Sequence, residues 1–432
     1  MKNPKKALIK LFKKIKRVLG VSNSITIYTN DHLDLVNQAA RICVKLPPLE
    51  NFEDKLDYVE KVVKKGHDST LEHTNVIMLL EIPELHYKDF IQLEDALKYL
   101  NYKIVFTKDS FNMLISGSIR GYKHVFKNVK HLESNFIIKT IKQELYNSTY
   151  SIYYTDLIKA GIMDEKYFKA SEITTDEEVE FIYDKESDQL DIKPKAQKER
   201  VKEEYNTFNI ISFDDIDKIY ELVKDYGFTY DDLLDICTIS VEFKNISRAI
   251  SQQLVRHRNA ISQESQRYVN YSDMKFIDPR QFKDNYKDKE FSLNINETTM
   301  DLDNYVNLMM DVYKQLLNQG MVREDARGYL PFNIETKLLM TFTFRHLILF
   351  LELRVQKSAQ AEIRAIANEL EEVFVDKVKD YIGKDIYIYA LPKYILLETK
   401  YAEEQDKEEN YSEDYGVIYE EIIEQEDKNS KK

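Results

Sequence analysis

The sequence is short of cysteine, of long apolar runs and of net positive charge, and each shortage restricts the function. Its 432 residues include only Cys43 and Cys237, both in apolar stretches. Two buried thiols give neither a disulfide framework nor a zinc site, so no metal centre and a reducing, cytoplasmic setting are expected. No run of about 18 apolar residues occurs, so no membrane-spanning helix is expected. The formal net charge of −13 argues against a chain that coats nucleic acid.

The chain is too long for one ordinary compact domain, and its composition divides it into five segments. Residues 1–22 form a basic arm with apolar residues at helical spacing. This arm is interpreted either as a helix on an anionic membrane or partner surface, or as a solvated arm. We expect residues 23–83 and 236–389 to form two parts of one core, 84–235 an inserted subdomain, and 390–432 an acidic, partly disordered tail.

The predicted fold class is α+β, a small sheet packed with helices. Helices are expected over 33–44 and 54–65, strands over 75–82 and 237–243, and further helices within 302–382. The sheet should contain both strands, with the insertion as a peripheral mixed subdomain. A weak internal repeat relates FNMLISGSIRGY (111–122) to LLMTFTFRHLIL (338–349), each an apolar strand that leads to an arginine. Chance resemblance between amphipathic segments is the favoured explanation.

The segment 246–271 (ISRAISQQLVRHRNAISQESQRYVNY) concentrates groups that bind an anion and a heterocycle. Gln253, Arg256 and His257 are expected on one face of a helix, with Arg258 at its end. Arginine matches phosphate through two parallel hydrogen bonds, and amides read the edge of a base. A surface charge cluster is the ordinary explanation of an Arg-His-Arg triplet that stands alone.

Two further blocks carry similar groups. In GHDSTLEH (66–73), Ser69 and Glu72 have the spacing of a capping box, which predicts the start of a helix, and such a start also suits an anionic cofactor. The block 320–363 contains Arg327 on a short helix, followed by Arg345 and Arg354. Nine residues separate these two arginines, so on one helix they point to opposite faces and serve different pockets.

Taken in order, the three blocks resemble the motifs of flavin-dependent thymidylate synthases. The resemblance covers 25–82 and 236–389, and implies methylation of dUMP to dTMP with methylene-tetrahydrofolate, FAD and NADPH. It also implies a homotetramer with active sites at subunit interfaces. The chain departs from the family pattern in a spacing one residue short between Arg258 and Ser265, and in Thr343 and Leu349, where the family commonly has asparagine.

The resemblance also assigns roles to single residues. Arg354 polarises the uracil, and His67 lies near the flavin and the folate. The dUMP positions are Gln253, Arg256, Gln263, Glu264, Ser265, Gln266, Arg267, Arg327 and Arg354. The FAD positions are Ser69, Arg256, His257, Arg258, Thr343 and Arg345. None of these residues lies in 84–235, so a short linker in place of that segment should preserve cofactor binding.

Two other functions remain open at this point. Arginines and tyrosines of 256–271 are compatible with a non-catalytic module that binds single-stranded nucleic acid. The altered 343–349 segment is compatible with a related flavoenzyme that acts on another pyrimidine nucleotide. Neither cysteine has an activating neighbour in the sequence, so a route that uses no cysteine nucleophile is favoured.

Overall fold

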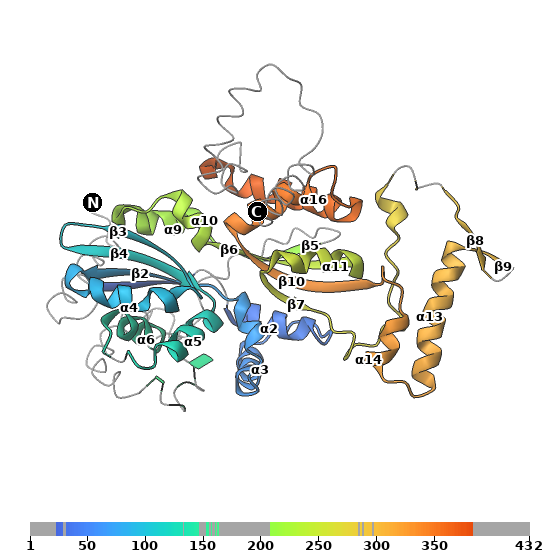
Figure 1. Ribbon diagram of the computed structural model, residues 1–432, viewed down its shortest axis with the longest axis horizontal. Coiled ribbons are helices and arrows are strands. Elements are labelled where there is room, and N and C mark those ends of the chain that lie inside the picture. Colours follow the sequence, from blue (N-terminus) through green and yellow to red (C-terminus); the bar gives the residue numbers. More distant parts are fainter. Residues whose placement is uncertain are drawn as a thin grey trace, which may run out of the picture.

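The computed structural model consists of two four-stranded antiparallel sheets with helices around them (Figure 1). It describes residues 23–28, 32–132, 134–146, 208–283, 289–295 and 298–382, with the single positions Tyr153, Tyr154, Leu157, Ala160, Ile162, Met163 and Tyr286. The predicted arm 1–22, the charged stretch 174–205 and the tail 390–432 lie outside these residues. Among the described helices, none is both long and apolar enough to cross a membrane.

The first half of the described chain builds the first sheet, in the order β1-β2-β4-β3. Its elements are β1 (Asn23–Tyr28), α2 (His32–Ile42), α3 (Phe52–Lys64), η1 (Asp68–His73), β2 (Val76–Pro83), η2 (Glu84–His86), α4 (Tyr87–Leu97), β3 (Asn101–Phe106), β4 (Ser110–Gly117), α5 (Ile119–Asn128) and α6 (Phe136–Tyr146). The predicted helices 33–44 and 54–65 and the strand 75–82 are confirmed as α2, α3 and β2.

The second half builds the second sheet, in the order β5-β6-β10-β7. Its elements are β5 (Phe208–Phe213), α9 (Ile216–Val223), η6 (Lys224–Tyr226), α10 (Tyr230–Ile236), β6 (Thr238–Ser247), α11 (Arg248–Leu254), η7 (Val255–His257), β7 (Ala260–Gln263), η8 (Pro279–Phe282), β8 (Ser292–Ile295), β9 (Thr298–Asp301), α13 (Leu302–Asn318), α14 (Arg323–Ala326), η9 (Arg327–Tyr329), β10 (Glu335–Thr343), α15 (Phe344–Arg354) and α16 (Ala361–Ile382). Helix α13, α14 and the β8–β9 hairpin extend away from the sheets (Figure 1).

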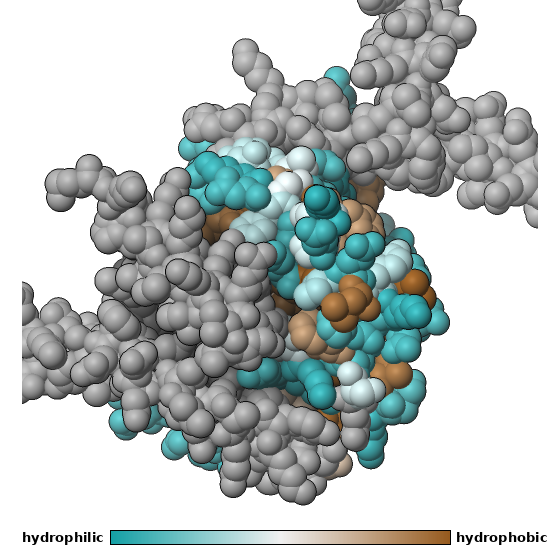
Figure 2. Space-filling model, turned by 90° about the vertical axis from the view of Figure 1, so that its left-hand side faces the viewer, coloured by the Kyte–Doolittle hydropathy of each residue, from teal (hydrophilic) through white to brown (hydrophobic). Residues whose placement is uncertain are grey.

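Alternation along β2 explains how the two halves share a core. Met78 and Leu80 belong to the apolar cluster beneath α4, α5 and α6, whereas Ile77 and Leu79 belong to the cluster of α9, α10 and the second sheet. Successive side chains of a strand point to opposite faces, so the first sheet is buried on both sides. On the face that Figure 2 shows, the described residues are mainly hydrophilic, with scattered apolar residues among them.

Two expectations about the fold need correction. The strands predicted over 75–82 and 237–243 lie in different sheets rather than in one. The segment 84–235 is also not peripheral, because its strands β3 and β4 pair within the sheet of β2, and its strand β5 pairs with β6. The predicted boundaries at 83/84 and 235/236 therefore separate strands that are joined by hydrogen bonds. The apolar strand at the start of 111–122 was visible in the sequence, but its pairing partners were not.

Candidate functional site

The Arg-His-Arg segment lies where helix α11 ends and strand β7 begins. The α-helix stops at Leu254, earlier than predicted, and a 3₁₀ turn carries the chain to His257. Arg258 then adopts a left-handed conformation with φ 52°, which costs free energy in a residue other than glycine. This turn leaves the side chains of Arg256 and Arg258 exposed to solvent.

His257 and Arg354 are in direct contact. Arg354 Nε donates a hydrogen bond of 3.1 Å to Nε2 of His257. Burial, together with the smaller effects of the nearby Arg354 and His346, lowers the pKa of His257 to about 4. The imidazole is therefore neutral at pH 7, so its Nε2 is able to accept this bond. The contact fixes the orientation of the guanidinium at the end of α15.

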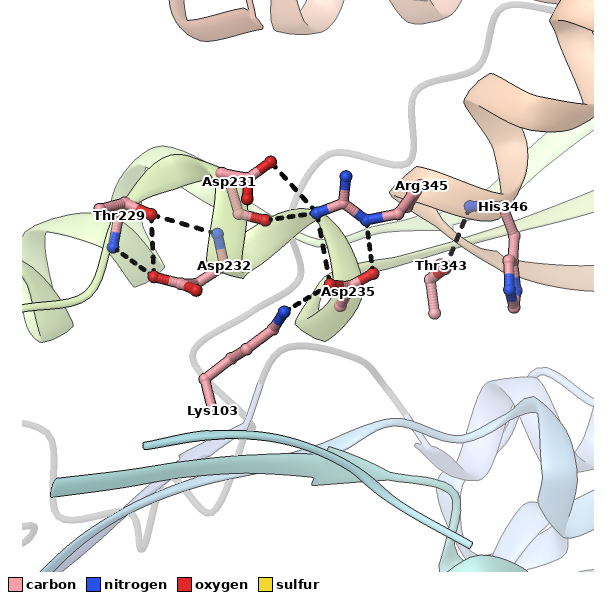
Figure 3. Close-up of polar contacts among 8 residues, drawn as sticks. All are labelled: Lys103, Thr229, Asp231, Asp232, Asp235, Thr343, Arg345 and His346. Atoms are coloured by element: carbon pink, nitrogen blue, oxygen red, sulfur yellow. Dashed lines mark hydrogen bonds and ion pairs between the residues drawn. The ribbon is translucent and has the colours of Figure 1, made fainter. Parts of the chain in front are cut away.

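Arg345, at the other end of α15, points toward α10 instead (Figure 3). Its Nε donates to Asp235 at 2.7 Å, and its Nη2 to the Asp231 carboxylate at 3.2 Å and the Asp231 carbonyl at 2.8 Å. Lys103 of β3 reaches the same Asp235 at 2.8 Å. The two arginines of α15 thus serve different environments, as predicted, but the one expected to bind FAD is engaged by two carboxylates. Thr343 is engaged too, because its hydroxyl accepts a bond from the backbone N–H of His346 and caps the helix.

The predicted dUMP residues of the loop after β7 lie near helix α14. Arg267 Nε donates to Glu324 at 3.0 Å, and Arg327 Nε donates to the Glu324 carbonyl at 3.1 Å. An open depression is lined by Arg267, Asn270, Leu317, Gly320, Met321, Val322, Arg323 and Glu324. The guanidinium groups that line this hollow are those of Arg267 and Arg323, and a pair of arginines suits a phosphate group; Arg327 is not part of the lining.

The remaining residues of this loop differ in exposure. Glu264 is buried, and burial raises the pKa of its carboxyl group. Gln263 and Gln266 are half-buried, and Ser265 Oγ accepts a hydrogen bond from the Arg267 N–H at 3.3 Å. Gln253, on α11, donates to Gln360 at 2.7 Å.

The first block forms a 3₁₀ turn rather than a capped α-helix. The turn begins at Asp68 after His67, which makes no side-chain capping bond, so the predicted Ser69–Glu72 capping box is wrong. Glu72 binds Arg120 at 2.5 Å instead. The side chains of His67 and Ser69 are exposed.

His73 joins the three blocks, and the sequence did not reveal this role. It is fully buried, and its ring nitrogens lie 2.9 Å from Thr341 Oγ1 and 3.0 Å from Ser262 Oγ. Burial lowers its pKa to about 3, so the ring is neutral. The apolar strand that follows His73 was the available signal for burial.

The cysteines lie at different depths. Cys237 is buried, as predicted, whereas Cys43 is half-buried. Burial raises the pKa of the Cys43 thiol, which keeps it protonated and a poor nucleophile. Its carbonyl accepts a hydrogen bond from the Ser265 N–H at 3.0 Å, so α2 supports the loop after β7.

Comparisons with known proteins agree with these motifs. Residues 181–378 match the family described as thymidylate synthase complementing protein. A flavin-dependent thymidylate synthase of Geobacter sulfurreducens is 35% identical over 173 residues, 40% of this chain and 68% of the relative. The chain belongs to the flavin-dependent thymidylate synthase family. Enzymes of the same name from Pyrococcus furiosus (32% identical, covering 38% of this chain and 65% of the relative) and Clostridium tetani (31%, covering 42% and 73%) are also similar.

The family match bears on the predicted insertion. It runs without interruption across the predicted boundary at 235/236, and begins at residue 181, well after the block 66–73. An interrupted core with one inserted subdomain is therefore not confirmed. The second sheet and its helices lie within the matched range, apart from the last residues of α16.

Proposed function

We propose that the protein methylates dUMP to dTMP, with methylene-tetrahydrofolate as carbon donor and NADPH as reductant. Family membership supports this reaction, and the contact between Arg354 and His257 is the observation that carries it. The family pattern puts Arg354 at the uracil, and this contact holds its guanidinium in one orientation. A fixed donor near a developing negative charge stabilises a transition state.

The chain offers suitable groups for FAD. Arg256 and Arg258 are exposed on the turn between α11 and β7, and Ser69 is exposed on η1. Cationic and hydroxyl groups of this kind fit a diphosphate. The neutral His257 beside them accepts from Arg354 at Nε2, so its Nδ1–H is able to donate one hydrogen bond. When bound, FAD supplies the hydride that completes the methyl group. His67, exposed next to Ser69, is proposed to contact the flavin and the folate.

The hollow beside α14 is proposed to take dUMP. Arg267 and Arg327 are suited to its phosphate, and Gln263 and Gln266 offer amides to the uracil. Gln253, Glu264 and Ser265 complete the proposed set, with Ser265 in a binding role. A homotetramer, in which another subunit completes each site, remains part of this proposal.

The visible absorption spectrum and a dUMP-dependent reaction test the proposal. The purified protein should carry a flavin, and its reduced form should be oxidised faster when dUMP and methylene-tetrahydrofolate are added. Binding of single-stranded nucleic acid without flavin would support the non-catalytic module instead. Oxidation with another pyrimidine nucleotide, and not with dUMP, would support the related flavoenzyme.

A further inference from the structure

The two sheets have the same construction. In both, the chain forms an edge strand, then helices, then the second strand, a helix, the opposite edge strand and finally the third strand. The orders β1-β2-β4-β3 and β5-β6-β10-β7 correspond strand for strand, with every neighbouring pair antiparallel. One additional segment, from η8 to η9, lies between β7 and β10 in the second half.

The spacing also agrees from β4 to α6 and from β10 to α16. Residue numbers differ by 225 in each equivalent pair: Ser118 and Thr343 cap α5 and α15, and Phe136 and Ala361 begin α6 and α16. Burial follows the same alignment, because Ile119, Tyr122 and Phe126 are buried as are Phe344, Leu347 and Leu351. Chance resemblance, the explanation favoured from the sequence, does not produce this agreement in spacing, caps and burial together.

Polar contacts repeat at equivalent positions. The first N–H of α5, from Ile119, donates to Thr74 Oγ1 at 2.9 Å, and that of α15, from Phe344, donates to the Cys237 carbonyl at 3.0 Å. The arginine that follows each of these residues, Arg120 or Arg345, forms an ion pair with the turn before the second strand.

The equivalence of those ion pairs follows from strand register. Val76 pairs with Gly117, and Ile239 pairs with Phe342. Glu72, the partner of Arg120, lies four residues before Val76. Asp235, the partner of Arg345, lies four residues before Ile239. The partners of the two arginines are therefore equivalent residues.

Contacts between the halves are reciprocal. Turn η1 of the first half packs on β7, while its equivalent in the second half, α10, packs on β3, the equivalent of β7. Turn η1 meets β7 through His73 and Ser262, and α10 meets β3 through Asp235 and Lys103. Such mutual exchange of equivalent contacts is the property of a two-fold interface. The halves are related like two subunits of a symmetric dimer.

The two halves differ in the groups that matter for the reaction. Val129 stands at the position of Arg354, and the register of β3 and β7 puts residues 97–99 (Leu-Lys-Tyr) at the positions of 256–258. Conversely, the second half has no histidine at the position of His67. That position is Tyr230, the first residue of α10, whose hydroxyl donates a hydrogen bond to Asp217 at 3.1 Å. The first half therefore lacks the arginines of the second, and the second half lacks the histidine of the first.

We propose that the chain is an internal duplication whose two halves both contribute residues to one flavin site. The first half supplies the turn 66–73 with Arg120 and His124 of α5, and the second half supplies Arg256 to Arg258 and Arg354. The equivalent surface of the second half, around Arg345, binds no cofactor. This inference rests on the proposed function, and it assigns the anion-binding role to Arg120 instead of the equivalent Arg345.

The charge of each turn favours this division. Asp68 and Glu72 of the first turn are matched by Lys123 and Arg120, with Lys127 of the same helix nearby. The equivalent segment of the second half, α10, has three carboxylates for the two cations Arg345 and Lys103 (Figure 3). These carboxylates are Asp231, Asp232 and Asp235. A diphosphate is repelled by the excess negative charge of the second turn and tolerated by the first.

An aromatic pair lies beside Arg120 in the first half, and the equivalent positions of the second half lack it. The ring of His124 stacks on Tyr99 with centroids 5.2 Å apart, and Tyr99 is 42% exposed. Planar heterocycles stack on such rings. The twin positions hold Leu349 and Arg258, which form no aromatic pair.

Substitutions at equivalent positions of the two halves, made in the full chain, test the inference. His124→Ala should weaken FAD binding about tenfold, equivalent to about 1.4 kcal/mol, whereas Leu349→Ala should leave it unchanged. Arg120→Gln should also weaken FAD binding, while Arg345→Gln should mainly lower the melting temperature. The unaltered chain should hold one FAD, measured by absorbance after gel filtration. Affinity is measured by flavin fluorescence, and folding by circular dichroism.

Several outcomes would overturn the inference. Two FAD molecules per chain would mean that both twin surfaces bind. Loss of FAD from the folded Arg345→Gln variant, with retention in Arg120→Gln and His124→Ala, would return the site to the second half alone. If Arg120→Gln does not fold, His124→Ala and Leu349→Ala decide. Absence of flavin from the unaltered chain would contradict the proposed function as well.

Discussion

Buried, neutral His73 should make the protein sensitive to mild acid. Burial lowers its pKa from 6.5 to about 3 in the folded chain. The unfolded chain binds a proton at this ring below about pH 6.5, while the folded chain does not until about pH 3. Its stabilising contribution is therefore complete above pH 6.5 and is lost progressively as the pH falls toward 3.

The size of the effect follows from the pKa difference. At pH 5, about 1.5 units below the unfolded value, the loss is about 2 kcal/mol, at 1.36 kcal/mol per unit. His73→Gln removes the titrating ring and keeps a polar group near Ser262 and Thr341. It should lower stability at pH 7, because the two hydrogen bonds are disturbed, yet lose about 2 kcal/mol less than the unaltered chain between pH 7 and pH 5.

Urea unfolding at pH 7 and pH 5 measures this difference. The exposed His131 gives a matched control, since His131→Gln removes a histidine without disturbing the core. The reasoning would be refuted if His73→Gln lost as much stability between the two pH values as the unaltered chain does.

Three further predictions concern activity and assembly. Arg354→Lys should keep the fold but lower kcat about 100-fold or more, because lysine cannot reproduce the planar fork of donors; near-normal turnover would remove Arg354 from the mechanism. The double variant Cys43→Ala, Cys237→Ala should still form dTMP, and a well-folded variant without product would contradict a route free of cysteine nucleophiles. Replacement of 84–235 by a short linker should give aggregated protein, because it removes β3, β4 and β5 from the two sheets; a soluble variant that retains FAD by gel filtration would contradict the shared core.

Local features of the fold could be predicted from the sequence, and long-range pairing could not. The apolar period predicted α2, α3 and β2 within a few residues, because each buries one face or stripe. The same pattern could not show that β4 pairs with β2, since amphipathic strands of this kind are compatible with many partners. The segment 84–235 was misjudged for this reason.

The candidate site shows the same limit. Motif order correctly indicated the family, and helical geometry correctly separated Arg345 from Arg354. The ion pairs of Arg345 with α10 depend on a tertiary contact across more than a hundred residues, which no local pattern encodes. His73 was missed because a histidine followed by a strand gives no sign of which hydroxyl groups will surround it.

The ratio of nucleotide product to oxidised flavin tests the proposed reaction. The flavin of the purified protein is reduced without oxygen, then mixed with dUMP and methylene-tetrahydrofolate, and the nucleotide product is quantified. We expect about one dTMP for each flavin oxidised, with no product when dUMP is omitted. Flavin oxidation without dTMP, or dTMP formation by protein that carries no flavin, would contradict it.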